Sequence, residues 1–195
     1  MKVAIIGGAF NPVTLAHKEI SRVLQIVAPE LDQVWYLPTG AHPFQKSYIF
    51  EHSRLHILSQ TLGKNERICN LELEQGMSGK TFDTVQKLRK AYSHEFYFVI
   101  GGDCLLDFDS RWYRANELAS IVPFIVLGRD GYSISSYQGL LSKPPHRIIP
   151  DSGLPHISST LVREAIEKNL DISHLVPPEV AGEINKYGRF ANSNK

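Results

Sequence analysis

Residues 2–17 read KVAIIGGAFNPVTLAH. A short apolar run is followed by a glycine turn, and the turn by a helix with Thr14 and His17 three residues apart, which puts both on one face. The free N–H groups and the dipole of a helix N-terminus favour an anion, and glycines admit a ligand close to the backbone. The stretch predicts an α/β protein with a polyphosphate site; alternatively, the glycines serve packing only. The predicted backbone contacts of this turn are Gly7 and Gly8.

The composition favours a small-molecule enzyme. In 195 residues, 21 Lys and Arg balance 20 Asp and Glu, for a net charge of +1, so we expect no nucleic-acid partner. No apolar run approaches the roughly 20 residues that span a bilayer, and residues 1–20 do not resemble a signal peptide. Cys69 and Cys104 share no motif, which favours a reducing compartment. We expect a cytoplasmic enzyme without a membrane partner.

Strand-length apolar runs alternate with stretches of helical period. The predicted strands are Lys2–Ile6, Gln33–Leu37, Arg67–Leu71, Phe96–Ile100, Phe124–Leu127 and Arg147–Ile149. The predicted helices are Leu15–Val27, His52–Leu62, Phe82–Tyr92, Ser159–Lys168 and Pro178–Tyr187, the last followed by Gly188. This alternation predicts a doubly wound parallel sheet of Rossmann-like type, which binds ligands at the carboxyl ends of its strands.

The same pattern indicates the domain organisation. One domain is expected over residues 1–195, with a helical C-terminal segment at about 151–190. Residues 130–145 and 38–50 lack periodicity and are predicted to be loops, and the second follows a strand as binding loops often do.

A second candidate phosphate site lies in the C-terminal part, where residues 157–163 read ISSTLVR and open a helix. Arg163 lies one turn inside the helix, on the face of the hydroxyls, and its guanidinium fork matches phosphate geometry. The alternative is a capped helix with a solvated arginine. The hydroxyls concerned are those of Ser158, Ser159 and Thr160.

His52 and His56 lie at i and i+4 with His42 upstream, so a zinc site is conceivable. No third ligand with metal spacing is evident, and a solvated helix face is favoured over zinc.

Taken together, Gly7–His17 and Ile157–Arg163 resemble the signature pair of the nucleotidyltransferase superfamily, and within it the nicotinate/nicotinamide mononucleotide adenylyltransferases. The resemblance covers residues 2–187. It departs at Asn11, Thr14 and Ala16, where the bacterial nicotinate branch usually has aspartate, histidine and glycine. Further short motifs resemble those of the family and occur in the family's order along the chain. They are Pro38–Gly40 with Lys46, Arg54, Thr81–Thr84, Gly101–Asp103 with Trp112, Gly128–Tyr132, and Leu175–Pro177 with Val180.

The resemblance implies adenylyl transfer from ATP to nicotinate or nicotinamide mononucleotide in NAD biosynthesis, with Mg²⁺ accompanying ATP and with small molecules as partners, in a possible homo-oligomer. It implies catalytic roles for His17, Thr14 and Arg163. It implies ATP contacts at Gly7, Gly8, Ala9, Phe10, Lys46, Gly101, Asp103, Ser158, Ser159 and Thr160. It implies pyridine-nucleotide contacts at Thr81, Thr84, Trp112, Tyr113 and Arg129.

Several of these residues have a structural alternative. Trp112 is otherwise a core aromatic, Thr81 a helix cap, and Asp103 and Arg129 turn residues. At the level of function, the alternatives are a sister enzyme such as phosphopantetheine adenylyltransferase and a nucleotide-binding module without catalysis.

Overall fold

The computed structural model describes residues 1–40, 53–129 and 134–191. Its centre is a six-stranded sheet in the order β3-β2-β1-β4-β5-β6, with parallel pairing throughout. The chain reverses direction across the sheet between β1 and β4, which is the topological switch point where such sheets bind ligands. The strands are β1 (Lys2–Gly8), β2 (Gln33–Pro38), β3 (Glu66–Ile68), β4 (Glu95–Gly101), β5 (Phe124–Arg129) and β6 (Arg147–Leu154).

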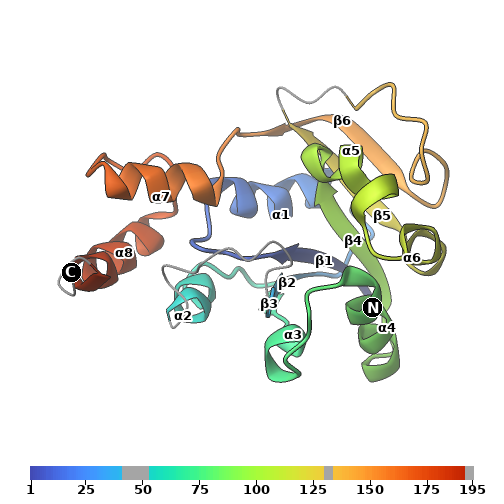
Figure 1. Cartoon of the computed structure of the whole chain (residues 1–195), viewed down its shortest axis with the longest axis horizontal. Coiled ribbons are helices and arrows are strands. Elements are labelled where there is room, and N and C mark those ends of the chain that lie inside the picture. The colour runs from blue at the N-terminus through green and yellow to red at the C-terminus, as the bar shows by residue number, and fades with distance from the viewer. Residues whose placement is uncertain (41–52, 130–133, 192–195) are drawn as a thin grey trace.

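Helices cover both faces of the sheet (Figure 1). One face carries α1 (Leu15–Val27), α2 (Arg54–Ser59), α7 (Ser159–Glu167) and α8 (Pro178–Ala191). The other carries α3 (Leu71–Glu74), α4 (Thr81–Ala91), α5 (Gly102–Arg111) and α6 (Ala115–Ile121). The α/β doubly wound fold predicted from the sequence is confirmed.

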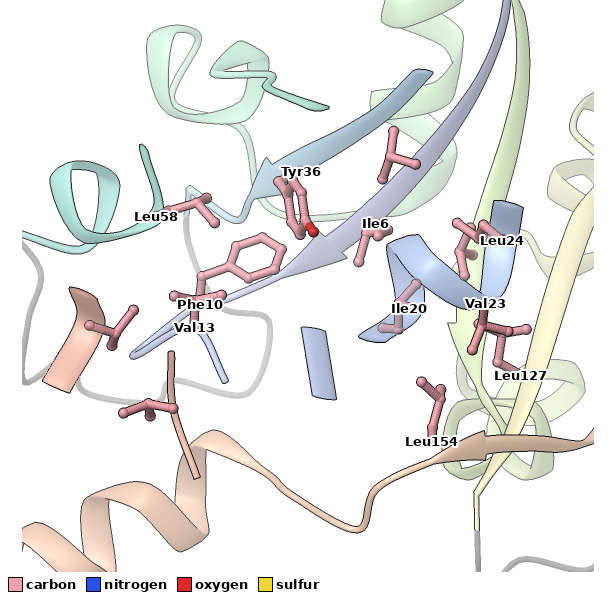
Figure 2. Close-up of a cluster of buried hydrophobic side chains, with 14 of the residues drawn as sticks. Ile6, Phe10, Val13, Ile20, Val23, Leu24, Tyr36, Leu58, Leu127 and Leu154 are labelled. Carbon is pink, nitrogen blue, oxygen red and sulfur yellow. The ribbon is translucent and has the colours of Figure 1, made fainter. Parts of the chain in front are cut away.

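Each central strand contributes alternate residues to two separate cores, because successive side chains of a strand point to opposite faces. In β1, Ala4 and Ile6 join the core under α1, whereas Val3 and Ile5 join the core under α4. Burial on both faces explains why these strands are apolar without interruption. Figure 2 shows the first core, in which Phe10 points toward Tyr36 at a ring-centroid distance of 5.6 Å.

The helix predicted at Leu15–Val27 is confirmed to the residue. Helices α2, α4 and α7 begin or end one to three residues from their predicted bounds, as frayed ends commonly do. Residues 134–145 contain no helix or strand, as predicted for this part of the loop. The expectation of one domain over 1–195 stays a prediction; α7 and α8 share the first core with α1, which supports it.

Three expectations were wrong, and two helices were missed. The strand predicted at Arg67–Leu71 ends at Ile68, because Leu71 begins α3 with Asn70 at the N-cap position. Residues 151–154, expected in the helical segment, extend β6 along β5. Helix α8 continues past Tyr187, its expected end, to Ala191. Helices α5 and α6 were not predicted.

Candidate active site at the carboxyl ends of β1 and β4

The glycine turn is shaped by aromatic rings beneath it. A Cβ on Gly7 would lie 3.1 Å from the ring of Phe98, and a Cβ on Gly8 would lie 3.3 Å from the ring of Phe10. Phe10 itself adopts a left-handed backbone (φ 46°) and is 1% exposed. A Cβ at either position would therefore press against an aromatic ring, and Phe10 presents its backbone to the turn, since its ring forms the floor.

The N-terminus of α1 follows this turn, with Thr14 as its N-cap. The imidazole Nδ1 of His17 accepts the backbone N–H of Thr14 at 3.0 Å and lies 2.8 Å from the Thr14 hydroxyl. A backbone N–H can only donate, so Nδ1 is an acceptor and the neutral ring carries its proton on Nε2. The Thr14 side chain is fully buried. It therefore orients His17 through these contacts, and its predicted catalytic role stays a prediction.

The surroundings of His17 keep its ring neutral. Burial lowers the pKa of His17 to about 4, with a smaller contribution from the positive charge of Arg129. The ring meets the edge of Phe10 at 5.1 Å between centroids, and the His17 carbonyl accepts the hydroxyl of Tyr36 at 3.4 Å. This histidine is thus a fixed hydrogen-bond donor through Nε2, not a cation.

The two distant signature segments meet. The hydroxyl of Ser159 donates to the carbonyl of Pro12 at 2.8 Å, and the guanidinium of Arg163 donates to the carbonyl of Asn11 at 2.9 Å. The two N-terminal turns of α1 and α7 therefore lie at one place in the fold, as Figure 1 shows for the two helices.

Both interpretations of the serine-threonine segment hold in part. Ser158 caps α7 by accepting the N–H of Leu161 at 3.2 Å, as the structural alternative proposed. Arg163, however, is not a solvated arginine: it is half-buried and also donates to the hydroxyl of Thr160 at 3.1 Å. Ser158 and Thr160 are exposed next to this helix entry, where an anion would be bound.

Arg129 lies at the carboxyl end of β5, beside the end of β4. Its Nε is 3.8 Å from the position of a Cβ on Gly101, and this buried nitrogen has no hydrogen-bond partner among the described residues. Asp103 is exposed in the first turn of α5, next to the same glycine. Arg129 thus lies beside Gly101 and near Asp103, two residues predicted for ATP, and its predicted contact with the pyridine nucleotide stays a prediction.

The residues predicted to hold the pyridine nucleotide separate into two groups. Trp112 is half-buried against three rings of the second core, with centroid distances of 5.1 Å to Phe108, 6.3 Å to Phe124 and 6.5 Å to Phe98. Tyr113 is 47% exposed and meets the start of α4, where Lys80 Nζ lies 4.4 Å from its ring centroid.

The two threonines of α4 that were predicted to contact the pyridine nucleotide also differ in their exposure. Thr81 is half-buried at the first residue of the helix. Thr84 is fully buried, and its hydroxyl donates to Glu72 Oε1 at 2.7 Å. The Thr84 hydroxyl is therefore engaged inside the protein, and its predicted contact with the pyridine nucleotide stays a prediction.

Two buried charged residues near the site were not assigned a role from sequence. Arg54 is 3% exposed and Glu72 is 2% exposed. Burial raises the pKa of Glu72 above its usual range. The hydrogen bonds from Thr84 and from the backbone N–H of Gly40 offset only part of this effect. For Arg54 the sequence contains a signal of burial. Arg54 precedes the buried Leu58 by four residues, which puts a charged residue on the apolar face of a predicted helix.

Lys46, His42 and His52 lie outside the described residues. In residues 1–40, 53–129 and 134–191, no group of three or more His, Cys, Asp or Glu is placed to hold a metal ion. No helix in these ranges is long and apolar enough to cross a membrane.

Comparison with known proteins agrees with this geometry. Residues 5–165 match the family model described as cytidylyltransferase-like. The chain is 37% identical over 191 residues to a probable nicotinate-nucleotide adenylyltransferase of Carboxydothermus hydrogenoformans, with 92% of each chain covered. A relative of the same name from Oceanobacillus iheyensis is 30% identical over 190 residues, with 95% of each chain covered.

The fold also matches a solved structure, that of Plasmodium falciparum nicotinic acid mononucleotide adenylyltransferase complexed with NaAD. The TM-score is 0.78 at 23% identity, over 99% of this chain and 98% of that one. A doubly wound sheet on which two helix entries join in this way is the architecture of a nucleotidyltransferase. The chain belongs to the cytidylyltransferase-like family and, within it, to the family of the nicotinate-nucleotide adenylyltransferases.

Proposed function

We propose that this chain transfers the adenylyl group of ATP to nicotinate mononucleotide, giving the dinucleotide and pyrophosphate in NAD biosynthesis. The observation that carries the proposal is the junction of the two helix entries, through Ser159 and Pro12 and through Arg163 and Asn11. It makes one anion site from two N-termini. The names of the relatives supply the substrates.

The reaction needs no protein nucleophile. A phosphate oxygen of the mononucleotide attacks the α-phosphorus of ATP, a new P–O bond forms, and the bond from that phosphorus to the pyrophosphate oxygen breaks. The nucleophile is already an anion, so no general base is required. The protein must align the two anions and stabilise the charge that passes to pyrophosphate.

The described residues divide these tasks. The backbone of Gly7, Gly8 and Ala9 lines the approach to the α-phosphate, and the Nε2–H of His17 donates to an oxygen that gains charge. A neutral donor whose ring is already oriented by Thr14 needs no rearrangement in the transition state. Arg163 supplies the positive charge, with Ser158, Ser159 and Thr160 around it. Lys46 is proposed as a further phosphate contact from its loop.

The adenosine half of ATP is assigned to the ends of β4 and β5. The missing Cβ of Gly101 makes space for the carboxylate of Asp103, which is exposed for a ribose hydroxyl. Among the described residues the buried Nε of Arg129 has no partner, which supports moving this residue from the pyridine side to the ATP side, because a buried donor without a partner is costly.

The pyridine ring is assigned to the surface where the α5–α6 turn meets α4. Tyr113 offers an exposed ring, Trp112 the edge of a packed one, and Thr81 a hydroxyl. The ammonium of Lys80 lies over the Tyr113 ring. A cation at this position favours the carboxylate of nicotinate over the amide of nicotinamide.

Mg²⁺ is proposed to enter with ATP, held by phosphate oxygens and water, as this ion usually is. When bound, it neutralises charge on the phosphates. The proposal also includes small molecules and no nucleic acid as partners. It further includes a cytoplasmic location and a possible homo-oligomer.

Steady-state assays of pyrophosphate release test this function. ATP with nicotinate mononucleotide should give the dinucleotide, with a higher kcat/KM than nicotinamide mononucleotide. Lys80→Met should reduce that preference at least threefold, while the exposed Lys87→Met on the far part of α4 should not. Release with phosphopantetheine alone would assign a sister enzyme. ATP binding without any turnover would indicate a binding module.

A further inference from the structure

A single peptide group next to the site lies between two buried charged side chains. The carbonyl oxygen of Thr39 accepts a hydrogen bond of 2.8 Å from Arg54 Nη2. The N–H of Gly40, which belongs to the same peptide group, donates to Glu72 Oε2 at 3.3 Å. Arg54 and Glu72 are 3% and 2% exposed. Such bonds are strong in a protein interior, and each polarises the next.

Each of the two side chains also holds a second element. Arg54 Nη1 donates to the carbonyl of Ala9 at 3.1 Å, at the end of the glycine turn. Glu72 Oε1 accepts the hydroxyl of Thr84 at 2.7 Å, inside α4. The chain of contacts therefore runs from the phosphate turn, through the peptide that follows β2, to the helix that begins the proposed pyridine surface.

The fit around this peptide leaves no spare room. A Cβ on Gly40 would lie 2.8 Å from the carbonyl oxygen of Glu72 and 3.1 Å from that of Met77. Both obstacles are backbone atoms, which move less readily than the end of a side chain. The Thr39 N–H also donates to the carbonyl of Gly8 at 3.0 Å, so the segment is held on its β1 side as well.

We propose that Arg54 and Glu72 act as positioning residues of the transferase, which grip the Thr39–Gly40 peptide from both ends and so fix the Ala9 turn relative to α4. The proposal rests on the proposed function for its catalytic part. Neither residue needs to touch substrate. Misplacing the phosphate turn by a fraction of an ångström reduces the rate of a reaction that depends on alignment, so the main effect falls on kcat.

The experiment uses Arg54→Met, Glu72→Leu and the double variant, with Arg54→Lys and Glu72→Gln as conservative variants. Arg67→Lys and Glu74→Gln, both at exposed positions nearby, are the matched controls. We expect each disrupting variant to lower kcat at least tenfold while KM for ATP stays within threefold. The double variant should lie within threefold of the worse single one, because both act on one peptide. Glu72→Gln should recover most of kcat, because its amide oxygen can accept the Gly40 N–H while its amide nitrogen donates to the Thr84 hydroxyl, which can donate to the Lys80 carbonyl instead.

A second readout does not depend on activity. Hydrogen exchange of the Gly40 amide, followed by NMR, should accelerate at least tenfold in Arg54→Met, although Arg54 does not touch that N–H. If Arg54→Met leaves Gly40 exchange unchanged, or if the losses in kcat multiply, the proposal is overturned. If the wild type makes no dinucleotide, the proposed function fails. The exchange measurement still decides whether Arg54 and Glu72 together hold the Thr39–Gly40 peptide.

Discussion

The guanidinium of Arg163 donates a 2.9 Å hydrogen bond to the carbonyl of Asn11, which lies 152 positions earlier in the chain. With the bond from Ser159 to Pro12, this contact joins the two signature segments that the sequence predicted to act together. Under the proposed function Arg163 has two duties, since the same group that holds the N-terminal turn is the cation proposed for phosphate.

Replacing Arg163 by lysine should separate these duties. Lysine keeps the charge but lacks the planar fork, so it cannot hold Asn11 and a phosphate at once. Loss of one charge-assisted hydrogen bond predicts a fall in kcat/KM for ATP of roughly ten- to a hundredfold. Arg22→Lys, on the exposed side of α1, is the control in the same assay. Equal kcat/KM for Arg163→Lys and wild type would argue against the phosphate role.

His17→Ala should lower turnover by at least tenfold and at most about a thousandfold, the range for removing one donor to developing charge. The fold should survive, because the ring lies at the edge of the core. Turnover and thermal unfolding are measured together with His56→Ala, an exposed histidine of α2. Turnover near the wild-type value would exclude His17 from charge stabilisation.

The protonation state of His17 gives a pH prediction. An unfolded histidine titrates near 6.5, whereas in the folded chain the pKa is lowered to about 4. Between these values the unfolded chain binds more protons, so the contribution of His17 to stability is complete above pH 6.5 and declines as the pH falls toward 4. At its largest the loss is about 3 kcal/mol.

Nitrogen NMR of the imidazole checks this directly. The ring should be neutral at pH 6 with its proton on Nε2, and chemical denaturation should show the decline in wild type but not in His17→Asn. A His17 that titrates near pH 6.5, or that carries its proton on Nδ1, contradicts the hydrogen bonds described here.

The two aromatic residues after α5 should behave differently when truncated. Trp112→Ala removes packing against three core rings and should cost about 3 kcal/mol of stability. Tyr113→Ala should change stability by less than about 0.5 kcal/mol but raise KM for the mononucleotide roughly fivefold or more, as loss of a stacking ring does. Leu106→Ala, exposed on α5, serves as control. An unchanged KM for Tyr113→Ala would move the pyridine site elsewhere.

Much of the fold could be predicted because its pattern is local. Helix α1 carries Ile20 and Leu24 on one buried stripe, and its bounds follow from that stripe. Helix α5 was missed because it begins at a Gly-Gly pair typical of a turn and shows only a narrow apolar stripe, Leu105 and Phe108, among aspartates. A short stripe of this kind is stabilised by tertiary packing, which the sequence does not display.

The site was predictable to the level of segments and not of atoms. Spacing put Thr14 and His17 on one face, but it did not reveal that Thr14 orients His17. The partners of Arg54 and Glu72 are backbone groups, whose positions depend on how distant strands align. Side-chain periodicity carries no information about such contacts.

The junction of α7 with the first turn has a consequence for synthesis on the ribosome. When residue 150 is added, β1 to β5 already exist as sequence, yet the carbonyls of Pro12 and Asn11 still lack Ser159 and Arg163. A nascent chain can thus build most of its sheet before the proposed triphosphate site is complete. Under the proposed function, competence arrives only after residues 159–163 have emerged from the ribosome.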